Sequence, residues 1–490
     1  MQRRGFLKGA VAGGAGLLLV SPRAAFTYQA NERLHLAIVG TWGYCSASFF
    51  VPHLHTLDNV SLTALCDVDL RKAANVYRLW QDRASGWPHS ERAEERVAAG
   101  LYQQLAKEPP PLYRDFRKML EDRDRHIDAV VCATPDHTHA IVSAASLRAG
   151  KHILAEKPLT IRAEESRALR ALAAERGHLA TSMGNQGTGS PQFRRGVELI
   201  RQGTIGPVEE VHIWFVRGGR NHLRPPQGSQ PVPPELEWDL WLGPVAWRAY
   251  HPGWISRNSW RDTTYGELGN MGPHDANMAF LGLNVCQLWA AGVAEPPVIR
   301  VQAEVSEINR LSFPRWERIR WSVPARGEMP PVVFTWHHGP TRDFAPGSRP
   351  MLEEKLRGLG ATQEQIDQHL GGRGCLIAGR HGAILAGTAN AQFVMLPARK
   401  FDNVQQARPE TLPASPRGHY QEWIAACRGG PMPMANFGYA TVLNEFLTLG
   451  QAATAYPDTP LEYDVRAGRF RNHAAANQWT GYAYRRGWSL

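Results

Sequence analysis

Cysteine and long apolar runs are both scarce in this sequence. Its 490 residues include only 6 cysteines, with no CxxC spacing and no tight cluster, which argues against a disulfide framework and against a zinc site. Beyond the N-terminal segment no run of about eighteen or more apolar residues occurs, so we expect no membrane span in the mature chain. With 43% hydrophobic and 20% charged residues, the composition is that of a globular protein of two or three domains.

A basic stripe is also lacking, although the formal net charge is +10. Residues 1–30 carry four of these excess charges, on Arg3, Arg4, Lys8 and Arg23, and contain no acidic residue. The other excess positive charges are spread along the chain. A mild and scattered excess favours solubility, so we expect no nucleic-acid partner.

The N-terminal segment has the pattern of an export signal. Arg3 and Arg4 are followed by a weakly apolar run, Gly9–Val20, which is rich in glycine and alanine and too short to span a membrane. This pattern predicts a twin-arginine signal in residues 1–30 and an exported, periplasmic mature protein. An ordinary basic tail and an uncleaved N-terminal anchor are the alternatives.

Four short apolar runs near the start of the chain alternate with helical patterns. The runs are Leu34–Val39, Val60–Cys66, Ile127–Ala133 and Lys151–Leu154. Apolar strands separated by helices are typical of βαβ units and of a parallel sheet that is covered on both faces. The polar segment 82–111 interrupts the alternation and predicts an inserted helical excursion.

Glycine follows the first of these runs and a carboxylate follows the second. Gly40 and Gly43 would let the backbone approach a pyrophosphate, and Asp67 could accept hydrogen bonds from an adenine ribose. A carboxylate there repels a 2′-phosphate, so NAD is favoured over NADP. Trp42 and Cys45 stand where the usual fingerprint has glycines, and an ordinary βα turn is the alternative. The sequence therefore predicts a dinucleotide-binding Rossmann domain over residues 31–158.

Two further motifs end at the same predicted sheet edge. Ala133–His139 (ATPDHTH) leaves the third apolar run, and Glu156-Lys157-Pro158 leaves the fourth. The carboxyl ends of parallel strands are where open α/β sheets bind ligands. Lys157 would be a cation near the nicotinamide and a donor to a substrate hydroxyl, whereas a surface salt bridge of Glu156 with Lys157 is the alternative.

After residue 158 the pattern changes to alternating polar and apolar residues. The alternating runs are Val208–Arg217, Val298–Val305, Arg318–Val323, Val332–Trp336 and Ala383–Met395. Strands without intervening helices favour a large, mainly antiparallel sheet. The predicted fold class is α/β, with the Rossmann domain followed by an α+β substrate-binding and oligomerisation domain over residues 159–490.

Several motifs together give the chain a family resemblance. Beside ATPDHTH and EKP, they are Gly266–His274 (GELGNMGPH), Gly184–Gln186, His419–Trp423, Asn472–Asn477 and Tyr484–Trp488. With them, residues 33–490 resemble the exported bacterial branch of the glucose–fructose oxidoreductase/inositol dehydrogenase (Gfo/Idh/MocA) family. The resemblance implies bound NAD, an open-faced second sheet and homo-oligomers that often form through the outer face of that sheet.

The resemblance also implies roles for single residues. His274 would take the hydroxyl proton of the substrate while hydride leaves the neighbouring carbon for NAD. Asn270 stands where many members carry Asp, and an amide can only orient the substrate or His274. The residues expected to contact the cofactor are Gly40, Trp42, Gly43, Tyr44, Asp67, Thr134, Pro135, His139, Glu156, Lys157 and Asn185.

A tryptophan-rich loop region precedes His274 and points to a carbohydrate substrate. Trp238, Trp241, Trp247, Trp254 and Trp260 lie within 25 residues, and indole faces stack well on the apolar C–H faces of sugars. The alternative is that these rings only pack the loops. The predicted substrate contacts are Trp260, Arg261 and His274.

These observations predict an exported NAD-dependent oxidoreductase that acts on a sugar or sugar derivative. Because free NAD is scarce outside the cytoplasm, we expect a tightly held NAD that is reduced and reoxidised within one cycle. A first alternative is redox-neutral glycoside cleavage by oxidation and elimination, as in the NAD-dependent α-N-acetylgalactosaminidases, which the chain resembles in motifs. A second is a non-catalytic sugar-binding protein with a decayed nucleotide site.

Overall fold

The computed structural model describes residues 33–43, 51–217, 221–290, 292, 295–341, 344–405, 407–412 and 418–490. The predicted twin-arginine signal in residues 1–30 and the predicted cofactor contact Tyr44 therefore lie outside the described residues.

The first sheet is parallel and has the strand order β3-β2-β1-β4-β5-β6. Its strands are β1 (Leu34–Val39), β2 (Val60–Cys66), β3 (Leu112–Tyr113), β4 (Ala129–Cys132), β5 (His152–Ala155) and β6 (Thr181–Met183). The four predicted apolar runs supply β1, β2, β4 and β5, because buried parallel strands need apolar residues on both faces. The last strand, β6, comes from beyond residue 158, where the sequence had placed the end of this domain.

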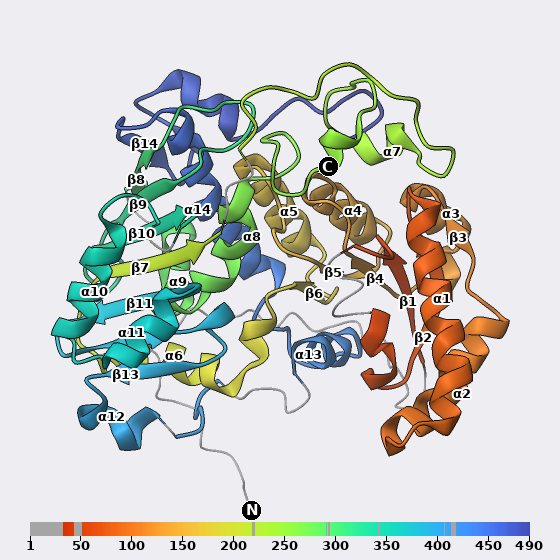
Figure 1. Ribbon diagram of the computed structural model, residues 1–490, viewed down its shortest axis with the longest axis horizontal. Helices are drawn as coiled ribbons and strands as arrows, with labels where there is room; N and C mark the ends of the chain where they lie inside the picture. Colours follow the sequence, from red (N-terminus) through yellow and green to blue (C-terminus); the bar gives the residue numbers. More distant parts are fainter. Residues whose placement is uncertain are drawn as a thin grey trace, which may run out of the picture.

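Helices cover this sheet and extend it at one side. They are α1 (Leu70–Gly86), α2 (Ala93–Lys107), α3 (Phe116–Asp122), α4 (Asp136–Arg148) and α5 (Ala163–Glu175). The helices α1 and α2 pack on each other as a hairpin at the right of Figure 1. The predicted helical excursion, 82–111, contains α2, whereas α1 begins before it. Asp69 caps α1 by accepting a hydrogen bond from the backbone N–H of Arg71.

The second sheet has nine strands in the order β13-β12-β11-β7-β10-β9-β8-β14-β15. The strands are β7 (Val208–Val216), β8 (Val298–Val305), β9 (Glu317–Val323), β10 (Val332–Gly339), β11 (Arg373–Gly379), β12 (Gly382–Ala386), β13 (Phe393–Leu396), β14 (Leu461–Asp464) and β15 (Arg469–Phe470). β7 pairs parallel with β10, and the other neighbours pair antiparallel. The predicted fold class is confirmed: a parallel Rossmann-type sheet precedes a large, mostly antiparallel one.

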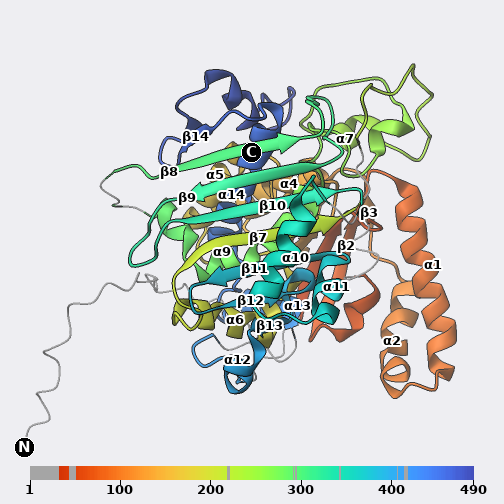
Figure 2. The same cartoon turned by 60° about the vertical axis from the view of Figure 1, so that its left-hand side comes forward.

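Nine further helices accompany this sheet in the described part of the chain. They are α6 (Pro191–Arg201), α7 (Trp238–Leu242), α8 (Gly266–Asp275), α9 (Asn277–Gly282), α10 (Ser348–Gly358), α11 (Gln363–Leu370), α12 (Ala398–Gln405), α13 (Gly418–Cys427) and α14 (Phe437–Ala455). In Figure 2, α10 and α11 lie in front of the sheet, and their leucines pack on its outer face. Among the described residues, no helix is both long and apolar enough to cross a membrane.

Helix α14 lies between the two sheets. It is 19 residues long and buried along almost its whole length. It contacts α5 and β6 of the first domain as well as α8, β8 and β9 of the second. Because α14 and its neighbours share one apolar core, the two domains are packed as a single unit.

Candidate active site

A cavity of about 330 Å³ lies at the carboxyl-terminal edge of the first sheet. It is lined by eight of the eleven predicted cofactor contacts: Gly40, Gly43, Asp67, Thr134, Pro135, His139, Glu156 and Lys157. These residues follow β1, β2, β4 and β5, so four loops that are distant in the sequence meet at one edge. This is the place at which open α/β sheets bind their ligands.

The first loop requires glycine at position 40. Gly40 has a φ of +85°, and a Cβ built on it would lie 2.6 Å from the carbonyl carbon of Ala133. No L side chain fits that backbone and that contact, so the chain can run close to a ligand here. Trp42 does not line the cavity and packs against a core cluster that includes Trp423, so its predicted contact with the cofactor stays a prediction. The indole therefore leaves the space beside Gly40 open.

Asp67 both lines the cavity and holds the glycine loop. Its Oδ2 accepts hydrogen bonds from the backbone N–H of Thr41 at 2.8 Å and from the Thr41 hydroxyl at 3.0 Å. Its Oδ1 accepts from the N–H of Asp69 at 3.0 Å. Burial raises the pKa of the Asp67 carboxyl, and these three hydrogen bonds counteract the rise. The carboxylate is thus fixed in the position where a ribose would meet it.

His139 joins the two motifs that follow β4 and β5. Its Nδ1 lies 2.7 Å from the carbonyl oxygen of Pro158, and its Nε2 lies 2.8 Å from that of Thr134. The histidine is 1% exposed, so it positions backbone and has little surface left for a ligand. The link keeps Lys157 and Thr134 at a fixed separation on the cavity wall.

Glu156 depends on a glycine in the next strand connection. A Cβ at Gly184 would lie 2.2 Å from Oε2 of Glu156, so a side chain at position 184 would displace this carboxylate. Asn185 does not line the cavity: it is fully buried and donates through Nδ2 to the carbonyl oxygen of Pro273 at 2.7 Å. Asn185 therefore supports α8 in this structure, and its predicted contact with the cofactor stays a prediction.

The ammonium group of Lys157 is held by α8. Its Nζ donates to the carbonyl oxygen of Asn270 at 2.7 Å and to Oδ1 of the same residue at 2.9 Å. Nη2 of Arg257 reaches the same Oδ1 at 3.2 Å. Nδ2 of Asn270 donates to Oε2 of Glu267 at 2.8 Å, which fixes the orientation of the amide. Asn270 thus links two cations to one buried carboxylate.

His274 lies one helical turn after Asn270, on the same face of α8. Burial lowers its pKa well below the ordinary value, and the positive charges of Lys157 and Arg373 lower it further. The ring is therefore neutral near pH 7. Its Nδ1 finds no hydrogen-bond partner among the described residues, so this nitrogen can take up a proton without first losing a bond. Neither His274 nor Asn270 lines the cavity, and Lys157 acts on His274 through its charge, so their joint catalytic role stays a prediction.

The substrate contacts predicted beside His274 lie elsewhere. Arg261 is 2% exposed and donates from Nε to the carbonyl oxygen of Asn309 at 2.7 Å and from Nη2 to the Thr454 hydroxyl at 2.9 Å. Trp260 is 1% exposed and donates through Nε1 to the carbonyl oxygen of Gly253 at 2.9 Å. Neither residue lines the cavity, because these side chains pack the loop that carries α8, and their predicted contacts with substrate stay predictions.

Sequence reasoning did not identify several residues of this site. Glu267 lies inside the Gly266–His274 motif, three residues before Asn270 on α8, so the helical spacing could have indicated their contact. Arg257 reaches Asn270 from a preceding loop, which only the fold shows. Asp275, whose pKa burial raises to about 6, lies 3.6 Å from Nε of Arg373 beside His274. Two members of the predicted tryptophan cluster, Trp241 and Trp254, do line the cavity. The sequence carried no signal for the further lining residues Leu236, Leu240, Ile255 and Trp488.

The described residues contain no cluster of three or more His, Cys, Asp or Glu side chains that could hold a metal ion.

Comparison with known proteins agrees with this geometry. Residues 34–184 match the model of the Gfo/Idh/MocA family, described as an oxidoreductase family with an NAD-binding Rossmann fold. A segment of 100 residues is 52% identical to dTDP-3,4-didehydro-2,6-dideoxy-alpha-D-glucose 3-reductase of Streptomyces violaceoruber, covering 20% of this chain and 28% of the relative. A segment of 89 residues is 37% identical to levoglucosan dehydrogenase of Pseudarthrobacter phenanthrenivorans, covering 17% and 22%. The chain thus matches less than a third of the length of either relative.

Solved structures share the fold over nearly the whole chain. The WlbA dehydrogenase of Bordetella pertussis, in complex with NADH and UDP-GlcNAcA, aligns with a TM-score of 0.51 at 15% identity and covers 88% of this chain and 98% of its own. An oxidoreductase domain protein of Kribbella flavida aligns with a TM-score of 0.50 at 18% identity and covers 87% and 98%. The prediction of an NAD-binding Rossmann domain is confirmed by the family match. Residues 34–184 are thus similar to the NAD-binding Rossmann domain of the Gfo/Idh/MocA oxidoreductase family.

Proposed function

We propose that this chain is an NAD-dependent oxidoreductase that transfers hydride from a carbon of a sugar or sugar derivative. The observation that carries the proposal is the position of Lys157, whose Nζ is fixed on Asn270 at the cavity wall while its charge acts on His274. A cation beside a neutral imidazole is the arrangement that oxidation of an alcohol needs.

The lining residues fit NAD in one direction along the cavity. Asp67 follows β2 and would hold the adenine ribose, whereas Glu156 and Lys157 follow β5 and would lie beside the nicotinamide ribose. The backbone around Gly40 would face the pyrophosphate between them. The carboxylate of Asp67 favours NAD over NADP, since it would repel a 2′-phosphate.

The protein's own groups handle the proton. When bound, the nicotinamide ring supplies the acceptor for hydride. His274, neutral near pH 7, would accept the proton of the substrate hydroxyl, and Lys157 would donate a hydrogen bond to the same oxygen and stabilise its developing negative charge. Asn270 would keep the ammonium group in that position, which replaces the direct carboxylate partner of other family members with an amide.

A sugar substrate, a retained cofactor and export are the finer parts of the proposal. The relatives named above act on sugar derivatives according to their names. Residues of the second domain, Trp241 and Trp254 among them, line the cavity from outside the Rossmann domain and would slow cofactor release. A retained NAD suits an exported enzyme, as the twin-arginine pattern of residues 1–30 suggests. Such a cofactor can also serve redox-neutral cleavage.

The first test is the nicotinamide content of protein purified from its exporting host. We expect about one NAD per chain in the supernatant after denaturation, and turnover of a sugar panel without stoichiometric release of NADH. Glycoside cleavage without net NADH would assign the redox-neutral chemistry. Protein that neither carries nicotinamide nor binds added NAD by calorimetry would refute the proposal and leave a sugar-binding protein.

A further inference from the structure

Residues 485–490, here called the strap, are far from the Rossmann domain in the sequence. In the fold the strap reaches the cavity through Trp488. Trp488 is half-buried and lines the cavity, together with Arg114 and Phe116, which follow β3. Because β3 lies next to β2 and on the opposite side of β1 from β5, this is the end where Asp67 would hold the adenine ribose. The Trp488 indole therefore faces the adenine half of the predicted cofactor, away from Lys157.

Arg117 and Phe116 fix the indole against the first domain. The guanidinium carbon of Arg117 lies 4.2 Å from the centroid of the Trp488 ring, and Nη1 of Arg117 donates to the carbonyl oxygen of Gly487 at 3.2 Å. Asp115 accepts from Nη2 of Arg117 at 2.7 Å and holds the guanidinium in place. The ring of Phe116 lies 6.3 Å from that of Trp488, centroid to centroid. These contacts join the strap to α3.

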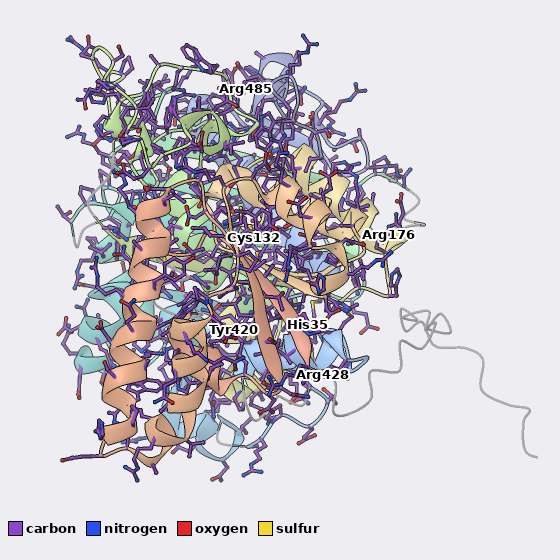
Figure 3. The ribbon with its side chains drawn as sticks, turned by 90° about the vertical axis from the view of Figure 1, so that its right-hand side faces the viewer. His35, Cys132, Arg176, Tyr420, Arg428 and Arg485 are labelled. Carbon is purple, nitrogen blue, oxygen red and sulfur yellow. The ribbon has the colours of Figure 1, made fainter. Side chains whose placement is uncertain are left out.

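Arg485 fixes the other end of the strap to the opposite wall. Its Nη2 donates to the carbonyl oxygens of Asp239 at 2.8 Å and of Gly243 at 3.0 Å, and its Nη1 pairs with the Asp239 carboxylate. Asp239 belongs to α7, whose residues Leu240 and Trp241 line the cavity. Arg485 is labelled at the top of Figure 3, above Cys132 at the end of β4.

The strap thus connects two walls of one cavity, α7 on one side and α3 on the other. A dinucleotide in the cavity would have to part these contacts, or leave around them, before it dissociates. We propose that the strap retains NAD, with Trp488 as a binding residue for the adenine half. This inference rests on the proposed function, and it supplies a physical reason for a cofactor that does not exchange.

The rate of cofactor exchange tests this inference directly. Purified holoenzyme is mixed with excess isotopically labelled NAD, and the replacement of bound NAD is followed by native mass spectrometry. We expect Trp488→Ala and Arg485→Ala to exchange NAD about 10-fold faster or more, since loss of one aromatic stack or of one anchor removes part of the barrier. Trp488→Phe should remain within about 3-fold of the parent protein, because it keeps an aromatic ring.

Trp247→Ala is the matched control, because Trp247 is 64% exposed and does not line the cavity. Nicotinamide mononucleotide, which lacks the adenosine half, separates the strap from a general loosening of the fold: Trp488→Ala should weaken NAD binding and leave binding of the mononucleotide unchanged. Equal exchange rates in the parent, Trp488→Ala and Arg485→Ala proteins would refute the proposed role of the strap. Equal losses of affinity for NAD and for the mononucleotide in Trp488→Ala would refute it as well. Absence of NAD from the parent protein would instead overturn the proposed function.

Discussion

The two ends of the cavity are built in different ways. At the end near β5, Lys157, Asn270 and Glu267 are buried and joined by hydrogen bonds of 2.7 to 2.9 Å. At the end near β3, the lining consists of the half-buried aromatic residue Trp488 together with Arg114 and Phe116. The first construction fixes single atoms within tenths of an ångström, as proton transfer requires, whereas the second provides contact area. We therefore expect substitutions at the first end to alter chemistry and those at the second to alter retention.

The largest effect should come from Lys157→Ala. Loss of the ammonium group removes both a donor to the substrate oxygen and a charge beside His274, so kcat should fall about 1000-fold or more while bound NAD is kept. Lys151→Ala is the matched control, since Lys151 is buried and donates from Nζ to the carbonyl oxygen of Asp124 at 2.6 Å, away from the cavity. Steady-state and single-turnover rates measure both. If Lys157→Ala kept the parent kcat, this end of the cavity would take no part in the chemistry.

The two arginines near α8 should behave in opposite ways. Arg261→Met should lower the free energy of unfolding by about 3 kcal/mol, because it leaves buried carbonyl oxygens without their donor, and it should hardly change KM. Arg257→Met should raise KM with little loss of stability, because Arg257 lines the cavity. Chemical denaturation and sugar kinetics compare the pair. If Arg261→Met instead raised KM and left the stability unchanged, the predicted contact of Arg261 with substrate would be supported.

Substitutions that move the carboxylate from position 267 to position 270 should show whether the Asn270 amide couples Glu267 to Lys157. Glu267→Gln and Asn270→Asp should each lower kcat about 10-fold, the first by removing the acceptor of Asn270 and the second by placing two carboxylates about 2.8 Å apart. The double variant returns one carboxylate and one amide to the pair, with the carboxylate now facing Lys157. We expect it to be faster than either single variant, as a double-mutant cycle would reveal. Additive losses would mean that the two residues act separately.

Acid should destabilise both ends of the cavity through buried histidines. Burial lowers the pKa of His137, under the Trp241 carbonyl, and of His419, beside Thr188, to about 4 each. Above about pH 6.5 these rings are neutral in both states; between there and about 4 the unfolded chain binds more protons, so stability falls as pH falls. His152 and His338 behave alike, whereas Asp275 and Glu317, with raised pKa values of about 6 and 7, oppose the trend.

Thermal unfolding measured from pH 7.5 to 4.5 checks this balance. We expect the midpoint to drop across that range, and His137→Gln with His419→Gln to reduce the drop. A midpoint that rises toward pH 4.5 would show that the two carboxylates outweigh the histidines.

The sequence predicted the parts of this molecule whose signals are local. β1 and β2 have the predicted bounds, Leu34–Val39 and Val60–Cys66, because continuous apolar runs between turn residues leave no other choice. The alternating run Ala383–Met395 proved to be two strands, β12 and β13, separated by a turn at Thr388–Asn390. Alternation alone does not show where a strand reverses when the turn residues are small.

Whether a site residue could be predicted from the sequence depended on the end of the cavity to which it belongs. Gly40 and Lys157 stand in short motifs at strand ends, so their chemistry is visible in a few adjacent letters. The sequence could not place Arg261, because an arginine beside tryptophans has the same composition whether it packs inside or faces a sugar. Trp488 meets the cavity and Arg117 only through the fold, and no spacing in the sequence encodes that contact.

Helix α14 has a consequence for how the molecule can move. Its 19 residues touch both sheets and are buried along almost the whole length. A hinge-like rotation of one domain against the other would expose that apolar surface to water at a high cost in free energy. We therefore expect ligands of the cavity to enter and leave through displacement of the loops at its rim, while the centre of the molecule stays rigid.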